Sequence, residues 1–213
     1  MKLVDLKVID FIEEVDSNSP APGGGSVSAL AAALGSALSS MVGHLTIGKK
    51  KFLALDEEIQ TKFKEHLSAL KQYKTKLVEL IDKDTDAFNS IMEAVRMPKN
   101  TEEEKALRLK KMEEGTIEAI QVPLMVAKEA DKMMDYLPFI LEHGNKQAAS
   151  DFGVSVLMIA AGVEGAVLNV LINLPGLSNE ETKSNFIKEA KEVLVEVTMK
   201  KELILKQVYQ YLE

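Results

Sequence analysis

The sequence predicts an all-α protein: a single-domain helix bundle with two buried helices rich in Ala, Gly and Ser. Long stretches with apolar residues at helical spacing fill most of the chain, and no alternating run of β-branched residues competes with them. Two further stretches, 26–48 and 152–174, carry almost no charge and many small residues. With 213 residues, 46% of them hydrophobic, the chain can bury a core, and we treat 1–213 as one helical domain.

The amphipathic elements are separated by clear breaks. Apolar spacing predicts a short helix over 3–16, and the segment SNSPAPGGG at 17–25 ends it because proline and glycine disfavour helix. Stretches with one charged and one apolar face predict long helices from Asp56 to Met97, from Thr101 through Pro123 to about Tyr136, and from Ser178 to the C-terminus.

The two stretches of low charge are long enough to span a membrane, so this alternative has to be weighed. Ala, Ser and Gly supply little transfer energy, no aromatic belt flanks 26–48, and Glu164 near the centre of 152–174 is costly in lipid. We therefore expect two helices buried in a soluble bundle, without membrane association. Glu164 is expected to point inward, where a hydrogen bond between helices would account for it.

Composition excludes several classes of function. A net charge of -7 argues against a nucleic-acid partner, because phosphate binding needs an excess of Lys and Arg. The chain has no cysteine, and His44, His66 and His143 lack the spacing of metal ligands, so no metal site is expected. Acids interrupt the apolar residues near the N-terminus, which therefore does not resemble an export signal, and we expect a cytoplasmic protein.

Asp84 is the strongest candidate for chemistry. The apolar stripe of its helix steps from Ile81 to position 84 before reaching Phe88, so this carboxyl points inward, while Asp82 and Asp86 are expected to face solvent. A carboxylate that faces a core is costly unless it is paired, hydrogen-bonded or used. Asp84 is thus either a catalytic acid or base, or a structural acid bonded to a neighbouring helix.

Three polar segments are weaker candidates. The GGGS segment at 23–26 precedes a buried helix and can bind an anion through backbone amides, although a structural turn explains it equally. The triple-lysine run at 49–51 is either a solvated loop or a partner for carboxylates. The segment HGNKQAASD at 143–151 either caps the second buried helix through Ser150 or Asp151, or contributes to a site.

Taken in order, these motifs resemble the formiminotransferase-cyclodeaminase C-terminal family. The resemblance rests on PAPGGGSVSAL, MVGHLTIGKKKF, DKDTDAF, VRMPKN, HGNKQAASD and NVLIN, and it extends from about Asp5 to Asn173. It implies a helical-bundle subunit that forms a homodimer and acts on a tetrahydrofolate derivative. Two activities belong to it: cyclisation of 5-formiminotetrahydrofolate to 5,10-methenyltetrahydrofolate with release of ammonia, and interconversion of 5,10-methenyl- and 10-formyltetrahydrofolate.

The resemblance also assigns site residues. Its Asp-x-x-Ala-Phe/Tyr motif corresponds to 84–88 and selects Asp84 as the catalytic residue. No cofactor beyond the folate-linked substrate is implied, and formimino transfer is not expected because the transferase domain is missing. The expected substrate-binding residues are Gly23, Gly24, Gly25, Ser26, Lys49, Arg96, Lys99, Asn145, Ser150 and Asp151.

Two other classes of protein remain possible at the level of sequence. A noncatalytic folate-binding or carrier protein would use the same pocket without turnover. A structural or membrane-associated helical subunit would use the two stretches of low charge. For the enzyme, a carboxylate at position 84 can protonate departing ammonia in cyclisation, or accept a proton from water in hydrolysis.

Overall fold

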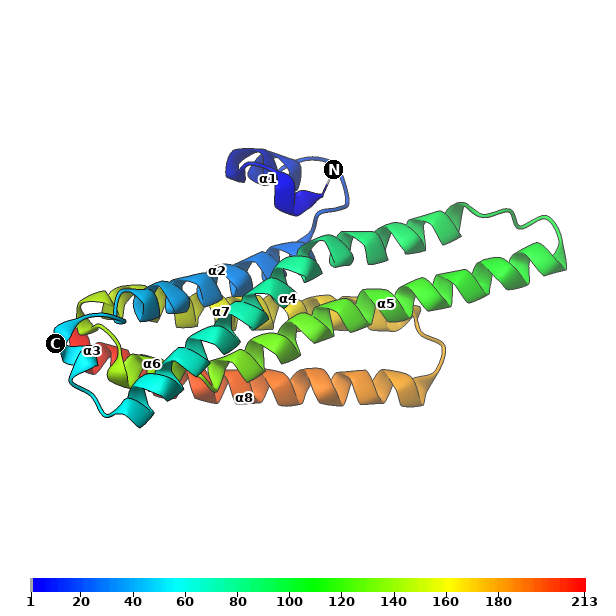
Figure 1. The fold of residues 1–213 in the computed structure, drawn as a ribbon. Helices are drawn as coiled ribbons and strands as arrows, with labels where there is room; N and C mark the ends of the chain where they lie inside the picture. The colour runs from blue at the N-terminus through cyan, green and yellow to red at the C-terminus, as the bar shows by residue number, and fades with distance from the viewer. Residues whose placement is uncertain (1) are drawn as a thin grey trace.

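The computed structural model describes residues 2–213, which form helices and loops without a β-strand (Figure 1), and so confirms the predicted all-α fold class. The long helices coincide with the predicted stretches to within a few residues. In chain order the helical elements are η1 (Leu3–Asp5), α1 (Val8–Val15), α2 (Gly24–His44), α3 (Lys50–Leu53), α4 (Glu57–Arg96), α5 (Glu102–Met134), α6 (Leu137–His143), η2 (Lys146–Ala148), α7 (Ala149–Asn173), η3 (Leu174–Gly176) and α8 (Glu180–Leu212).

The bundle is built around the antiparallel pair α2 and α7. Helix α4 packs on α2, α5 packs on α4 and α7, and α8 packs on α7 and α5. The C-terminal end of α4 and the N-terminal end of α5 form a hairpin that projects beyond the other helices (Figure 1). Helix α5 begins with a capping box at Thr101 and Glu104 and continues through Pro123 without ending.

Small residues let α2 and α7 approach closely. A Cβ atom added at Gly35 would lie 2.7 Å from the Ser155 carbonyl, and one at Gly162 would lie 2.7 Å from the Ser28 carbonyl. The Ser155 hydroxyl donates to the Gly35 carbonyl at 2.7 Å and also contacts the Ser39 hydroxyl. The predicted role of the Ala, Gly and Ser residues as close-packing surface is therefore confirmed.

The outer sides of α2 and α7 carry apolar side chains that face solvent in the single chain. We call this surface the α2/α7 face, and its main residues are Val27, Leu34, Met41, Val154, Leu157 and Leu168. By length and composition alone, Gly24–His44 and Lys146–Gly176 could each cross a membrane, and about half of each is buried inside the bundle. The expectation that Glu164 points inward is wrong: it is exposed on α7, between Leu157 and Leu168.

Some boundaries differ from the sequence prediction. The first predicted helix is two elements, η1 and α1, because the segment around Leu6 and Lys7 is extended. Helix α2 begins at Gly24 rather than Ser26, so two glycines lie in its first turn. Asp82 does not simply face solvent: it is half-buried, and its Oδ1 atom accepts a hydrogen bond from the Leu3 amide at 2.6 Å.

Candidate active site

Asp84 lies on α4 against the first turn of α2. The Ser26 hydroxyl lies 3.0 Å from Asp84 Oδ2, 2.9 Å from the Ile81 carbonyl and 3.2 Å from the Thr85 hydroxyl. Ser26 is fully buried and Asp84 is half-buried. The inward orientation predicted for Asp84 is confirmed, and the glycine-rich motif lies beside it as the resemblance requires.

Burial raises the pKa of Asp84 above its ordinary value of 3.8, although hydrogen bonds from the Ser26 hydroxyl and amide oppose the rise. The Ser26 hydroxyl lies within hydrogen-bond distance of both the Ile81 carbonyl and Asp84 Oδ2, and its bond to Asp84 favours the ionised carboxylate. The net direction of the pKa shift is therefore set by burial.

Gly24 and Gly25 are required because neighbouring side chains leave no room for a Cβ atom, and not because of their backbone conformation. A Cβ atom at Gly25 would lie 2.0 Å from Asp84 Oδ1, so any other residue would collide with the carboxyl. A Cβ atom at Gly24 would lie 2.9 Å from Asn169 Nδ2 on α7. Gly23 precedes the helix as its N-cap. The glycines therefore allow α4 and α7 to place polar side chains directly against the start of α2.

A groove leads from this site along α4. It has a volume of about 450 Å³ and runs between the loop at 19–21 and α4, from Thr85 and Phe88 to Arg96. Arg96 lies twelve residues beyond Asp84 on the same helix, which corresponds to about 18 Å. Lys99 follows in the exposed loop before α5. Both cations can therefore meet the distal, anionic end of a ligand whose other end lies at Asp84.

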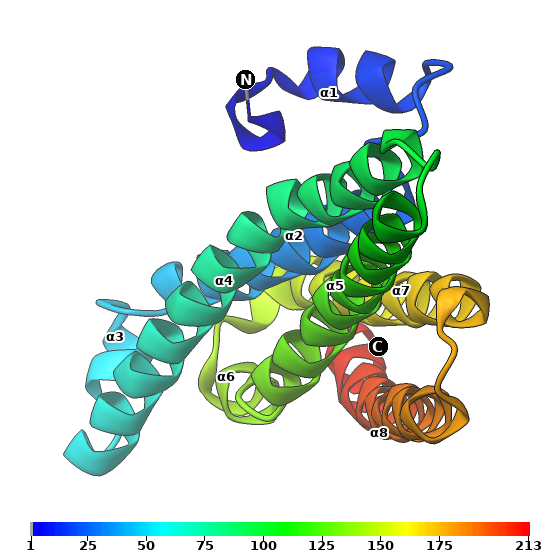
Figure 2. The same cartoon turned by 90° about the vertical axis from the view of Figure 1, so that its right-hand side faces the viewer.

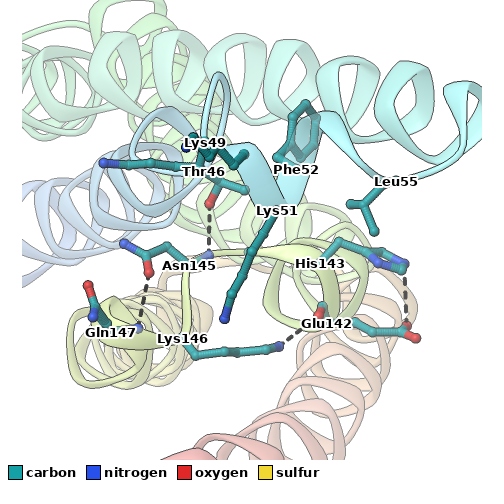
Figure 3. Close-up of a pocket in the computed structure, with 12 residues that line it drawn as sticks. Thr46, Lys49, Lys51, Phe52, Leu55, Glu142, His143, Asn145, Lys146 and Gln147 are labelled. Atoms are coloured by element: carbon teal, nitrogen blue, oxygen red, sulfur yellow. Dashed lines mark hydrogen bonds and ion pairs between the residues drawn. The ribbon is translucent and has the colours of Figure 1, made fainter.

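Two of the remaining predicted residues, Lys49 and Asn145, line a second pocket at the C-terminal end of α2. This pocket, which we call the lysine pocket, has a volume of about 530 Å³ and includes Lys49, Lys50, Lys51, Asn145 and Lys146 (Figure 3). The backbone amide of Asn145 donates a hydrogen bond to the Thr46 hydroxyl at 2.8 Å, and this bond fixes the loop after α6 to the end of α2.

The lysines of this pocket differ in how they are held. Lys146 donates to the carbonyls of Leu141 and Glu142 and lies 3.7 Å from the centre of the Tyr211 ring, so it has a structural role. Lys51 extends across the pocket toward the loop that carries Lys146 (Figure 3). Lys49 is exposed at the rim.

Ser150 and Asp151 lie in the first turn of α7, near this second pocket. They do not cap the helix, because Ala148 is its N-cap and makes no side-chain hydrogen bond. The alternative explanation of this motif as a helix cap is therefore wrong. Helix α2 has 21 residues and is about 30 Å long, so within one chain the Asp84 site and the lysine pocket are far apart.

Sequence reasoning missed three polar residues at these two sites. Thr85 contacts Ser26, Asn169 contacts the start of α2, and Thr46 holds the loop of Asn145. All three lie in motifs that carry the resemblance, Thr46 in MVGHLTIGKKKF, Thr85 in DKDTDAF and Asn169 in NVLIN, and this was the available signal. Across residues 2–213 no three His, Asp or Glu side chains gather in a way that could hold a metal ion.

The fold and site define a class of all-helical protein in which a half-buried carboxyl, that of Asp84, contacts the glycine-rich start of a helix beside a groove. A family profile described as Formiminotransferase-cyclodeaminase matches residues 7–192, so the chain belongs to this family, as the motifs indicated.

Individual relatives agree with this assignment. Methenyltetrahydrofolate cyclohydrolase of Methylorubrum extorquens is 38% identical over 186 residues, which cover 87% of this chain and 88% of that protein. Formimidoyltransferase-cyclodeaminase of Gallus gallus is 36% identical over 92% of this chain, which spans about a third (35%) of that longer protein. The crystal structure of formiminotetrahydrofolate cyclodeaminase from Thermotoga maritima superimposes with a TM-score of 0.75 at 27% identity, covering 98% of both chains.

Proposed function

We propose that this chain is a folate one-carbon enzyme that uses Asp84 as its acid and base. It cyclises 5-formiminotetrahydrofolate to the 5,10-methenyl compound with release of ammonia, interconverts the 5,10-methenyl and 10-formyl compounds, or does both. The observation that carries the proposal is a carboxyl of raised pKa, held by Ser26 at the start of α2 in a chain of this family.

The raised pKa suits both reactions. In cyclisation, N10 attacks the formimino carbon on N5, and the C–N bond to ammonia breaks once that nitrogen is protonated, which a neutral Asp84 can do. In hydrolysis, water attacks the methenyl carbon of a cation, and an ionised Asp84 can take the proton of the water while offsetting the positive charge. Neither reaction changes an oxidation state or requires a redox cofactor.

The rest of the folate fits the groove along α4. With the reacting carbon near Asp84, the glutamyl carboxylates reach toward Arg96, about 18 Å away along the helix, and toward Lys99 in the loop that follows it. The amides at the start of α2 supply further donors close to the reacting centre. The proposed location of these reactions is the cytoplasm.

The proposal includes a homodimer formed through the α2/α7 face. Contiguous apolar surface on a folded chain marks an interaction site, and the exposed charge of Glu164 within it favours a second protein over lipid. A two-fold axis across the middle of α2 makes the two copies of that helix antiparallel. Each Asp84 site then approaches the partner's lysine pocket, so that the predicted residues, which lie in two groups within one chain, meet between subunits.

A spectrophotometric assay with both folates tests the activity. Purified protein is expected to form methenyltetrahydrofolate from the formimino compound, or to hydrolyse the methenyl compound, and Asp84→Asn is expected to abolish most of this turnover. Asp86→Asn is the matched control, because Asp86 is exposed on the same helix. Tight folate binding without turnover of either compound would instead identify a carrier.

Light scattering tests the dimer separately. The wild type is expected to have twice the mass of the chain at micromolar concentration, and Leu34→Asp is expected to shift it to monomer because a charge enters the apolar face. Leu109→Asp, at an exposed leucine on α5, is the control and should stay dimeric. A wild type that remains monomeric would refute the proposed assembly.

A further inference from the structure

The N-terminal arm, residues 2–16, packs Leu3 and Phe11 against the core, but most of the apolar side of α1 is not covered by its own chain. Helix α1 buries none of its residues, and Val8 and Ile12 are 79% and 53% exposed. The arm is fixed near its start by the hydrogen bond from the Leu3 amide to Asp82. A helix of eight residues is marginal in water unless its apolar side is packed. The arm therefore requires a surface to pack against.

An apolar cavity of about 690 Å³ separates the arm from α2. Phe11, Ile12 and Val15 line it on the arm side, and Val27 and Leu34 line it on α2. Figures 1 and 2 show α1 standing apart from the bundle above α2 and α4. This space is open to solvent and has apolar walls, so it can receive apolar side chains of a partner.

The cavity is continuous with the α2/α7 face, because Val27 and Leu34 belong to both. Whatever covers that face also reaches the space below the arm. In the antiparallel dimer proposed above, with the axis near Leu34, position 27 of one subunit lies opposite position 41 of the other. The end of the partner's α2 thus arrives beneath the arm, and its exposed Met41 and Leu45 supply apolar side chains.

Charge complementarity supports the same occupant. Residues 2–16 contain five acids and two lysines, whereas the segment that follows α2 carries the lysine run 49–51. Asp16 lines the cavity itself. Opposite charges on facing surfaces steer association and fix its register. In this arrangement the acidic arm of one subunit meets the basic end of the partner's α2.

We propose that the N-terminal arm closes over the partner subunit and packs on the C-terminal end of its α2, so that the two subunits exchange arms. The inference rests on the proposed dimer and adds to it a defined contact. The exchange also affects the position of residues at the site. Each arm is fixed to Asp82 of its own chain, two residues before Asp84, so it holds the partner's lysine run close to the Asp84 site of the chain to which the arm belongs.

Cysteine crosslinking tests this contact cleanly, because the chain has no cysteine of its own. The double variant Ile12→Cys with Met41→Cys, treated with a short bismaleimide, is expected to run as a crosslinked dimer on a denaturing gel. Each single variant should give only monomer. The control pair Ile12→Cys with Leu203→Cys uses an exposed leucine on α8, away from the α2/α7 face, and should not crosslink between subunits.

Mixing the two single variants, each with a different affinity tag, should give a crosslinked species that carries both tags. A crosslinked monomer in the double variant would overturn the proposal, because the arm would then pack on its own chain. Absence of any crosslink in a protein that light scattering shows to be dimeric would also overturn it, while leaving folate turnover untouched. Arm-dependent flotation of the wild type with phosphatidylglycerol vesicles would identify lipid as the occupant and overturn it too.

Discussion

Replacing Gly25 by alanine tests the geometry of the site without removing any functional group. The new Cβ atom would lie 2.0 Å from Asp84 Oδ1, 2.4 Å from Cγ and 2.6 Å from Oδ2. Rotation about the Cβ–Cγ bond alone cannot relieve this, because Cγ is also too close, so the whole carboxyl group has to move away from its position. Oδ1 must move by about 1.4 Å, the difference between 2.0 Å and the 3.4 Å at which ordinary contact begins.

A displacement of this size has a calculable effect on catalysis. Misplacing a reacting group by 1 Å costs on the order of 10²-fold in rate, so we expect turnover of Gly25→Ala to fall by at least that factor. Overpacking costs about 1–3 kcal/mol of stability, and the better helix propensity of alanine recovers up to about 1 kcal/mol. The fold should therefore survive, and the loss should appear chiefly in kcat.

The double variant Gly25→Ala with Asp84→Ala isolates the contact. With the carboxyl removed, the alanine at position 25 has room, so we expect it to be neutral or slightly stabilising in that background. Thermal or urea unfolding of the four proteins in this cycle measures the coupling. If Gly25→Ala destabilises both backgrounds equally, or keeps full activity in the presence of Asp84, the close contact between these residues is not a feature of the working enzyme.

Three further substitutions have expected outcomes. In Asp84→Asn, kcat should fall by a factor of about 10² to 10⁴ while folate binding persists. Burial raises the pKa of Asp84 in the folded state, so the wild type should gain stability relative to this variant as the pH falls through that raised pKa toward 3.8. Unfolding experiments across a range of pH measure this difference. Lys200→Met removes the ammonium group that lies 2.7 Å from the carboxylate of the buried Asp131. The free energy of unfolding in urea should fall by about 1–3 kcal/mol, which is less than for a fully buried pair because Lys200 is partly exposed. An unchanged urea midpoint would contradict this. Gly35→Val places side-chain atoms against the Ser155 carbonyl on α7 and should lower Tm markedly in a thermal scan. A Tm equal to that of the wild type would show that α2 and α7 can move apart without cost.

Much of the fold could be predicted because its signals are local. The spacing of apolar residues locates α4, α5 and α8, and the scarcity of charge together with the small residues locates α2 and α7. Shorter elements such as α3 and α6 were not predicted, because four or seven residues are too few to show a period. The start of α2 at Gly24 was missed because glycine opposes helix by propensity, while packing against α4 and α7 decides its conformation here.

The candidate site was predictable to the extent that one helix defines it. The phase of the apolar stripe on α4 was enough to turn Asp84 toward the bundle. The role of Asp82 was not predictable, since its partner is an amide 79 residues away. Glu164 was misplaced because helical phase shows that a residue lies on an apolar side, yet it does not show which of two apolar sides is buried.

The uninterrupted course of α4 has a consequence for how this protein can vary. Asp84 and Arg96 are carried by one helix of 40 residues, so their separation is set by helical rise and does not change when loops move. One inserted residue between them would rotate Arg96 by about 100° and remove it from the groove, whereas a change of length in the exposed loop before α5 would leave Arg96 in place and move only Lys99. We therefore expect natural length variation to be excluded from 84–96 and to be less restricted at 97–101. In the proposed mode of binding, the distance between the two ends of the substrate therefore corresponds to a fixed number of residues on α4.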